Sequence, residues 1–382
     1  MAEALSISGE QLRSVPGTWG DPLRALARFP GAAPFVGGAG PLAVRGRLPD
    51  ATPTYVDGVR VSWPFHALLG PTSLSPALID RVDYYRGEAP ARFGFLTGGA
   101  IDIHLPERAS GTAVFGDVDQ RTARAGLASS AGPFGTTVLG SVGAYTTAWL
   151  YSRLSSSVEA NLYDWQLKVL QRVGRGDLRL LWFGSYDGGA LDQPPSFSAR
   201  PLAQMQRADL RYRCGCGLEV TATYGLDRLA FHGGGAVSAI DLDAAERTLL
   251  GRVRWTPSPA STGLPFHVEL GAEVERRQAD FQLGAQLQSP AVEGQPAQPP
   301  ISVAFRAPAI GTFASAWAQA AATDGALTVT PGLRVSTAHL AFTAATEAAF
   351  EPRLWVDYRA SDAYSVHGGA GLYHQPAQSL VP

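Results

Sequence analysis

The sequence has few cysteines and almost no lysine. Its 382 residues include two cysteines, Cys214 and Cys216, and a single lysine, Lys168. Two cysteines supply neither a disulfide framework nor a zinc site, which needs more ligands at wider spacing. A disulfide across one intervening residue is geometrically awkward, so we expect two free thiols in a tight turn.

Charge is also scarce. Charged residues make up 17% of the chain, whereas about 25% is typical of soluble domains. The formal net charge is −2, and no basic cluster indicates a nucleic-acid partner.

A secretory signal and a membrane-spanning helix are both missing. The first residues, MAEALSISGEQLRSVPG, lack a basic segment followed by an apolar one. Residues 125–152 form a charge-free stretch longer than the ~20 residues that span a bilayer as a helix. Gly, Ser and Thr crowd this stretch, and Gly132-Pro133-Phe134-Gly135 interrupts it. We therefore predict two strands joined by a turn.

Catalytic and metal-binding constellations are not evident. His232 and the three glycines after it resemble a lipase oxyanion loop, but no Gly-x-Ser-x-Gly elbow accompanies them. His267 and Glu269 share one face of a predicted strand without a second ligand pair nearby. We expect no enzyme activity, no metal site and no cofactor.

Strict alternation of apolar and polar residues dominates the chain after residue 110. In residues 266–275, Phe266, Val268, Leu270, Ala272 and Val274 alternate with His267, Glu269, Gly271, Glu273 and Glu275. The same period recurs in residues 218–227 and 327–336, with further candidates near 163–173, 207–213, 248–255 and 353–359. This period predicts β-strands, about 14 in all.

Strand length and connection length favour a membrane barrel over a soluble sandwich. The predicted strands approach the 9–11 residues of a membrane strand rather than the 5–6 of a soluble one. Short connections (174–177, 213–217, 361–362) are expected to alternate with long external loops near 187–202, 229–245 and 283–309. A secreted sandwich-type hydrolase remains an alternative, and it requires a nucleophile–base cluster.

Residues 1–109 have a different, mixed α/β character. Asp21 can cap a short helix that runs through Phe29, and residues 42–46 read as a strand. We predict one domain over 1–109 and a second over 110–382.

Glycine-joined motifs follow one another in a fixed order in the first domain. Tyr55-Val56-Asp57-Gly58 comes first, and a segment that begins at Ile79 closes on Arg86-Gly87. Arg92-Phe93-Gly94 follows, and Gly98-Gly99 then precedes Ile101 and Ile103. This order resembles the plug domain of TonB-dependent outer-membrane receptors, with Gly58, Gly87, Gly94, Gly98 and Gly99 as its motif glycines.

The resemblance implies a mainly β fold in the outer membrane of a Gram-negative bacterium. A small α/β plug would be followed by antiparallel transmembrane strands of a 22-stranded barrel. At the observed spacing the chain is about eight strands short of 22, so we expect it to be truncated at both ends.

The resemblance also implies which residues latch the plug and which bind a ligand. Plug arginines of this family meet barrel glutamates, so Arg86 and Arg92 are expected to face Glu219, Glu269 or Glu273. Outward plug loops would bring Arg45, Trp63, Phe65 and His66 to a ligand. Alternatively, Trp63 and Phe65 simply pack the plug against the barrel.

The implied function is uptake of a scarce solute such as a siderophore, cobalamin or an oligosaccharide. The expected partners are membrane lipid, the solute and the inner-membrane TonB complex, which grips a segment that precedes the plug and is absent here. The alternative is a non-transporting outer-membrane binding or structural protein with a plug-like domain.

Overall fold

The computed structural model describes most of the chain, namely residues 4–36, 39–66, 70–119, 121–131, 135–193, 197–235, 238–288, 299–341, 345–361 and 363–376.

The N-terminal part folds around a five-stranded mixed sheet. Its strand order is β1-β6-β7-β4-β5, with β4 parallel to β7 and the other pairs antiparallel. The bounds are β1 Leu5–Ser8, β4 Thr54–Val56, β5 Val59–Val61, β6 Arg81–Tyr85 and β7 Ala100–His104. Helices α1 (Gly9–Ser14) and α2 (Pro22–Leu26), 3-10 turns η1 (Pro49–Ala51) and η3 (Pro76–Leu78), and the hairpin of β2 (Ala32–Val36) and β3 (Ala39–Val44) complete this unit. We call it the plug.

Local capping sets the helices of the plug. Ser8 and Gln11 form a capping box at the start of α1. The Asp21 carboxylate accepts the N–H groups of Leu23 and Arg24 at the start of α2, as predicted. The α-helix ends at Leu26 rather than Phe29. Residues 27–29 continue it only as i→i−3 turns, in which the N–H groups of Arg28 and Phe29 bond to the carbonyls of Ala25 and Leu26.

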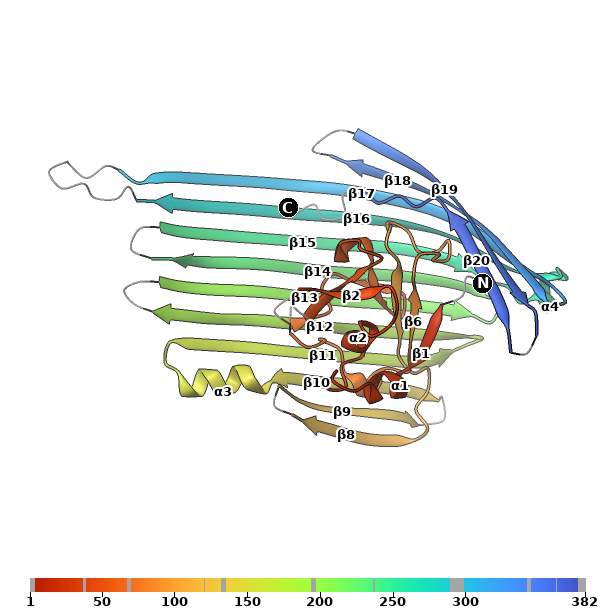
Figure 1. Cartoon of the computed structure of the whole chain (residues 1–382), viewed down its shortest axis with the longest axis horizontal. Coiled ribbons are helices and arrows are strands. Elements are labelled where there is room, and N and C mark those ends of the chain that lie inside the picture. Colours follow the sequence, from red (N-terminus) through yellow and green to blue (C-terminus); the bar gives the residue numbers. More distant parts are fainter. Residues whose placement is uncertain are drawn as a thin grey trace.

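The rest of the chain forms one antiparallel sheet of 13 strands in sequence order. We call it the wall; it curves around the plug (Figure 1). Its strands are β8 Thr112–Val118, β9 Thr122–Ala131, β10 Thr136–Tyr145, β11 Val158–Val173, β12 Gly176–Gln193, β13 Phe197–Cys214, β14 Leu218–Gly234, β15 Ser238–Trp255, β16 Phe266–Leu287, β17 Ile301–Asp324, β18 Leu327–Leu340, β19 Ala345–Arg359 and β20 Ser365–Gly371.

The two ends of the wall differ in their connections. Residues 174–175, 215–217 and 325–326 make short turns at one end, here the turn end. Residues 146–157 connect strands at the opposite, loop end, and they include helix α3 (Thr146–Leu154). A four-residue helix α4 (Pro259–Thr262) joins β15 to β16.

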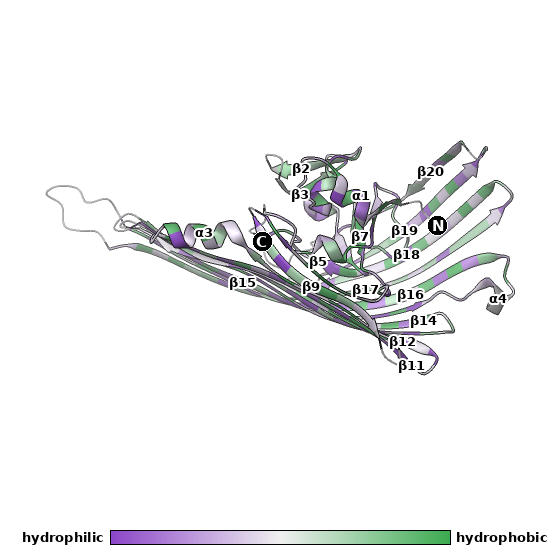
Figure 2. Cartoon of the chain, turned by 90° about the horizontal axis from the view of Figure 1, so that it is seen from below, coloured by the Kyte–Doolittle hydropathy of each residue, from purple (hydrophilic) through white to green (hydrophobic). Residues whose placement is uncertain are grey.

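The predicted alternation is confirmed. Leu270 and Val274 on β16 are 38% and 54% exposed, whereas Glu269, the residue before Leu270, is 7% exposed and faces Arg92 of the plug. Figure 2 shows the resulting alternation of hydropathy along the strands. The outward apolar residues end where ion pairs begin, as with Arg228–Asp243 (2.6 Å) and Arg306–Asp280. Strand β16 thus carries an apolar segment on its outward face.

The prediction of long external loops near 187–202, 229–245 and 283–309 is wrong for the described residues. Strands β12 to β17 continue through most of these segments, and they reach 18 to 24 residues in β12, β13 and β17. Backbone pairing persists where hydropathy alternation stops, because a solvated strand needs no apolar face. The Pro- and Gln-rich residues 289–298 lie outside the described part of the chain.

Residues 125–131 lie in β9 and residues 136–145 in β10, so the predicted pair of strands is confirmed. Residues 146–152 are helical, in α3, and residues 132–134 of the predicted turn lie outside the described part of the chain. Across the described residues, every helix is too short or too polar to cross a membrane.

The expectation of two free thiols is wrong. Cys214 and Cys216 are joined by a disulfide, with their Cα atoms 5.2 Å apart. The turn from β13 to β14 brings the two side chains together. Disulfides of this kind persist in oxidising compartments such as the bacterial periplasm.

Candidate functional site: the interface of plug and wall

Cationic side chains of the wall point inward and donate hydrogen bonds to plug carbonyls. Arg252 donates to Gly58 O (3.1 Å), Arg207 to Arg60 O (3.0 Å) and Arg124 to Thr72 O (2.8 Å). A guanidinium offers several donors in one plane, so it can hold a carbonyl and a carboxylate at once. The wall therefore grips the backbone of the plug rather than only its side chains.

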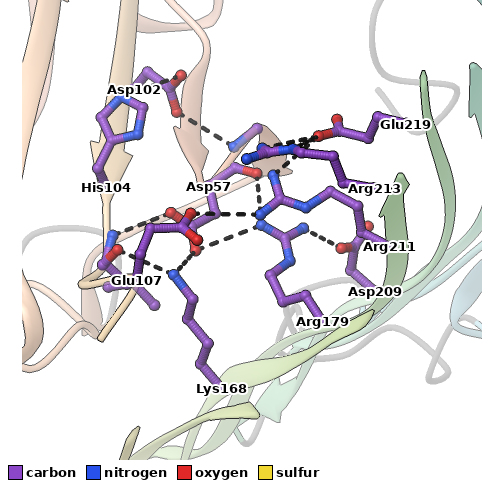
Figure 3. A network of polar contacts seen from close by, with 12 residues as sticks. Asp57, Asp102, His104, Glu107, Lys168, Arg179, Asp209, Arg211, Arg213 and Glu219 are labelled. Carbon is purple, nitrogen blue, oxygen red and sulfur yellow. Dashed lines mark hydrogen bonds and ion pairs between the residues drawn. The ribbon is translucent and has the colours of Figure 1, made fainter. Parts of the chain in front are cut away.

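The Asp57–Gly58 turn is held by Lys168 and Arg179, which lie close to the 174–175 turn of the wall. Figure 3 shows this anchor. Lys168 Nζ lies 2.8 Å from Asp57 Oδ2 and donates to Leu105 O at 3.0 Å. Arg179 donates to the Asp57 carbonyl at 3.1 Å. Burial by itself would raise the pKa of Asp57. The nearby charges of Lys168 and Arg179 lower that pKa by more than burial raises it, so Asp57 stays ionised.

A charged network extends this anchor along the wall. Arg179 also binds Asp209. Glu219 is held by the wall arginines Arg213 at 2.9 Å and Arg211 at 3.5 Å (Figure 3). A third wall arginine, Arg254, lies 3.0 Å from it. Glu219, expected to receive a plug arginine, therefore has its ion-pair partners within the wall.

A second anchor holds the segment from Ala89 to Phe93. Arg353 Nη1 donates to the carbonyls of Ala89 (2.9 Å), Pro90 (2.6 Å) and Phe93 (2.9 Å). Arg334 donates to Arg92 O at 3.1 Å and to the Glu273 carboxylate at 2.5 Å. Arg334 is fully buried, so losing these partners would leave an unpaired charge in the interior.

Only some of the predicted latch residues lie at the contact between plug and wall. Arg92 lies 3.8 Å from Glu269, which also accepts a hydrogen bond from Trp317. Glu273 binds the wall arginines Arg252 and Arg334. Arg86 is exposed, and no ion pair within the described structure joins it to a wall carboxylate.

Each of the five motif glycines stands where a larger residue would be sterically unfavourable. Gly58 and Gly87 have φ angles of 81° and 153°, which other residues rarely adopt. A Cβ on Gly94 would lie 2.3 Å from Arg334 Nε, one on Gly98 2.5 Å from Thr52 Oγ1, and one on Gly99 2.3 Å from Tyr85 O. These glycines allow the close approach of plug backbone to its neighbours.

His66 forms a third anchor, farther toward the loop end. Its Nδ1 lies 2.5 Å from Asp187 on β12 and its Nε2 lies 3.1 Å from Asp164 on β11. Arg124 also reaches Asp164, at 3.3 Å. Burial lowers the pKa of His66, but the hydrogen bonds to Asp164 and Asp187 outweigh it and raise the pKa to about 9. The imidazole is therefore a cation at neutral pH.

The predicted ligand residues do not form one exposed surface. Arg45 is exposed and lies 3.8 Å from Glu88. Trp63 is partly buried, and Phe65 and His66 are buried, contrary to the exposure expected of them. The loops fold onto the wall, where Asp164 and Asp187 hold His66.

A cavity of about 470 Å³ lies between the plug and strands β13 to β16. Its plug side includes Trp63 and Phe65. Its wall side carries paired charges, among them Arg207 with Asp227 (2.7 Å) and Arg277 with Glu275. The cavity is therefore polar on the wall side.

Sequence reasoning missed the wall cations. Lys168, Arg179, Arg334 and Arg353 lie on the polar faces of strands, where the alternation places them inside. Their position on the polar face of a strand predicts that they point inward. The sequence does not show which backbone carbonyl each of them binds. Within the described residues no cluster of three or more His, Cys, Asp or Glu side chains could hold a metal ion.

Comparisons with known proteins agree with this architecture. Residues 3–100 match the family model described as TonB-dependent Receptor Plug Domain. No curated protein matches the sequence.

Solved structures share the fold at low sequence identity. The ferric citrate transporter FecA, in its unliganded form, aligns with a TM-score of 0.64 and 17% identity over 97% of this chain and 62% of that one. The siderophore receptor PirA from Pseudomonas aeruginosa gives 0.61 and 16% over 98% and 62%. The outer membrane transporter YddB from Escherichia coli gives 0.59 and 10% over 93% and 58%. The chain thus spans about three fifths of the length of these structures.

Proposed function

This chain carries a TonB-dependent receptor plug domain followed by strands of the receptor barrel, and from that premise we propose that it serves the uptake of a scarce solute across the outer membrane. Proteins of this family are transporters of the Gram-negative outer membrane, not enzymes. The solute that we propose is a metal chelate of the siderophore class, and the inner-membrane TonB complex would supply the energy.

The way the wall holds the plug supports this proposal. The anchors are hydrogen bonds from wall cations to plug carbonyls, such as Arg353 to Ala89 and Arg334 to Arg92. A hydrogen bond to a charged group contributes about 1.5–3 kcal/mol, and water can replace it. A pulled plug can therefore release these contacts one at a time, which suits a gate more than a permanent seal.

A disulfide between plug and wall tests the gate. A Cβ on Gly332 of β18 would lie 3.4 Å from the Ala91 Cβ, close to the 3.5–4.5 Å separation in disulfides. We expect an Ala91→Cys/Gly332→Cys variant, made in a Cys214→Ser/Cys216→Ser background, to lock the segment from Ala89 to Phe93 onto the wall. In cells carrying the complete receptor gene, growth on a ferric chelate as iron source should stop and should return with a reducing agent.

The two single-cysteine variants are the controls and should grow with or without the reductant. Unchanged growth of the oxidised double variant would contradict a moving plug. Absence of growth in every strain, including the parent, would favour a non-transporting outer-membrane protein.

A further inference from the structure

The Cys214–Cys216 disulfide lies in a turn that the backbone already closes. Pairing of β13 with β14 continues up to Arg213 opposite Glu219. In the turn itself, the N–H of Gly217 donates to Cys214 O at 3.2 Å. A disulfide stabilises a fold by closing a loop of the unfolded chain, and the gain is small when the loop is short. A ring over one residue therefore adds little to the stability of this turn.

The disulfide lies at the surface of the turn end. Cys216 is exposed and Cys214 is partly exposed. Gly215 between them is also exposed and has no side chain that could cover the sulfur atoms. A thiolate from solution can therefore reach the disulfide, and it meets Cys216 first. Exposed disulfides are the ones that exchange readily with other thiols.

The turn can stabilise a negative charge on Cys214. The N–H of Cys216 donates to Cys214 Sγ at 3.2 Å. This donor belongs to the main chain, so it stays beside Cys214 after the S–S bond breaks. A hydrogen bond to a thiolate stabilises it, and a more stable thiolate leaves faster. Cys214 is therefore the better leaving group of the two cysteines.

The charges around the turn are mixed, with cations in the majority. Arg213, the residue before Cys214, shares the carboxylate of Glu219 with two further arginines. The described arginines at this end of β11 to β15 are Arg172, Arg175, Arg211, Arg213 and Arg254, and the carboxylates near them are Glu107, Asp177 and Glu219. Cations near a cysteine favour its thiolate. The surroundings thus support the charge that the main-chain N–H stabilises.

We propose that Cys214–Cys216 is a site of thiol–disulfide exchange whose substrate is a small soluble thiol. The proposal goes beyond solute uptake and does not depend on which solute is carried. Short turns of outer-membrane barrels lie on the periplasmic side, so the thiol would come from there.

The exchange has two steps. A thiolate of the substrate attacks Cys216 Sγ, the S–S bond of the protein breaks, and its electron pair leaves on Cys214 Sγ. A second substrate thiolate attacks the substrate sulfur of this mixed disulfide, and Cys216 leaves as a thiolate. Two thiols are oxidised to one disulfide, the protein disulfide is reduced, and the two thiol protons pass to Cys214 and Cys216.

The test compares reduction of the folded and the unfolded protein by glutathione. Free thiols of the purified protein in detergent are trapped by alkylation and counted by mass spectrometry. We expect the folded protein to be reduced about tenfold faster than the same chain in denaturant, because unfolding removes the hydrogen bond to Cys214 and disperses the arginines. A structural disulfide shows the opposite order, since folding shields it.

Variants assign the roles of the two sulfur atoms. Cys216→Ser keeps the main-chain N–H beside Cys214, so its remaining thiol should be alkylated at lower pH than that of Cys214→Ser. Arg213→Gln should slow reduction about threefold. Arg200→Gln is the matched control, because it removes an exposed arginine near the other end of β13 and should leave the rate unchanged.

Reduction should leave the melting temperature unchanged, because backbone pairing closes the turn. A lower melting temperature, or a folded protein that is reduced no faster than the unfolded one, overturns the exchange site and shows a structural cross-link. Faster reduction by the protein dithiol thioredoxin than by glutathione overturns the assignment to a small thiol. The locked-plug experiment is made without these cysteines, so it judges the uptake function separately.

Discussion

At the scale of single residues, the interface depends on charges that are buried together. His66 is 1% exposed and lies between Asp164 and Asp187, and Arg124 shares Asp164. The imidazolium offsets the repulsion between two carboxylates that face the plug. Its protonation therefore couples the plug loop to strands β11 and β12.

The stability of the protein should depend on pH through His66. Its folded-state pKa of about 9 lies above the unfolded value of about 6.5, so the stabilisation is complete below pH 6.5 and is lost as pH rises through 9. This pKa shift corresponds to a contribution of about 3 kcal/mol to the free energy of unfolding. Thermal melting of the wild type and of His66→Gln at pH 6 and pH 9.5 measures how much stability each protein loses between the two pH values.

The wild type should lose more stability between these pH values than the variant does. His104 also has a raised pKa, because Asp83 and Asp102 outweigh the lowering effect of burial. Both proteins contain His104, so its contribution cancels when the stability loss of the variant is subtracted from that of the wild type. Equal losses would show that His66 is not a protonated anchor.

At the scale of elements, wall strands act as rows of inward-pointing cations. β18 contributes Arg334 and β19 contributes Arg353, and together they hold the plug segment from Ala89 to Phe93. Gly94 lies directly against the Arg334 guanidinium, which also donates hydrogen bonds to Glu273 and Ser336. The fit leaves no room for a methyl group.

Gly94→Ala should displace Arg334 and loosen this anchor. We expect a destabilisation of about 1–3 kcal/mol, typical of overpacking at a tight site. Denaturant unfolding gives the loss, and protease cleavage of the segment from Ala89 to Phe93 should become faster. Gly251→Ala is the control, because a Cβ at Gly251 meets nothing within 4 Å. Equal stability of the two variants would refute the tight fit.

At the scale of the whole molecule, the wall separates two environments. Its inward face meets the plug with charges, while its outward face carries apolar side chains such as Leu270 and Val274. Farther along the same face of β16, Gln278 is exposed beyond the apolar segment. Lipid contact is expected for the first two residues and water contact for the third.

A charge on the outward face tests this arrangement. Leu270→Arg should cost about 2–4 kcal/mol when the protein is folded into bilayers, because the guanidinium enters hydrocarbon. Gln278→Arg on the same face should cost about 0–1 kcal/mol. Urea titration of folding into phospholipid vesicles measures both. Similar costs at the two positions would place the apolar segment outside the bilayer.

Sequence alone determined the features that depend on local pattern. The alternation from Phe266 to Glu275 predicted which side chains point outward, because successive residues of a strand face opposite ways. Asp21 predicted the start of α2 through its capping bonds. The order of the plug glycines predicted the first domain, since each glycine marks a tight turn or a close backbone approach.

Tertiary structure decided the partners. A carbonyl is the same in every residue, so nothing in the sequence showed that Arg334 and Arg353 would bind those of Ala89 to Phe93. The strands extend beyond their predicted ends because backbone hydrogen bonding between strands does not require alternating apolar and polar residues. The cysteines paired because the turn after β13 brought them together. Pattern fixes which face a side chain occupies, whereas packing in three dimensions selects what lies opposite it.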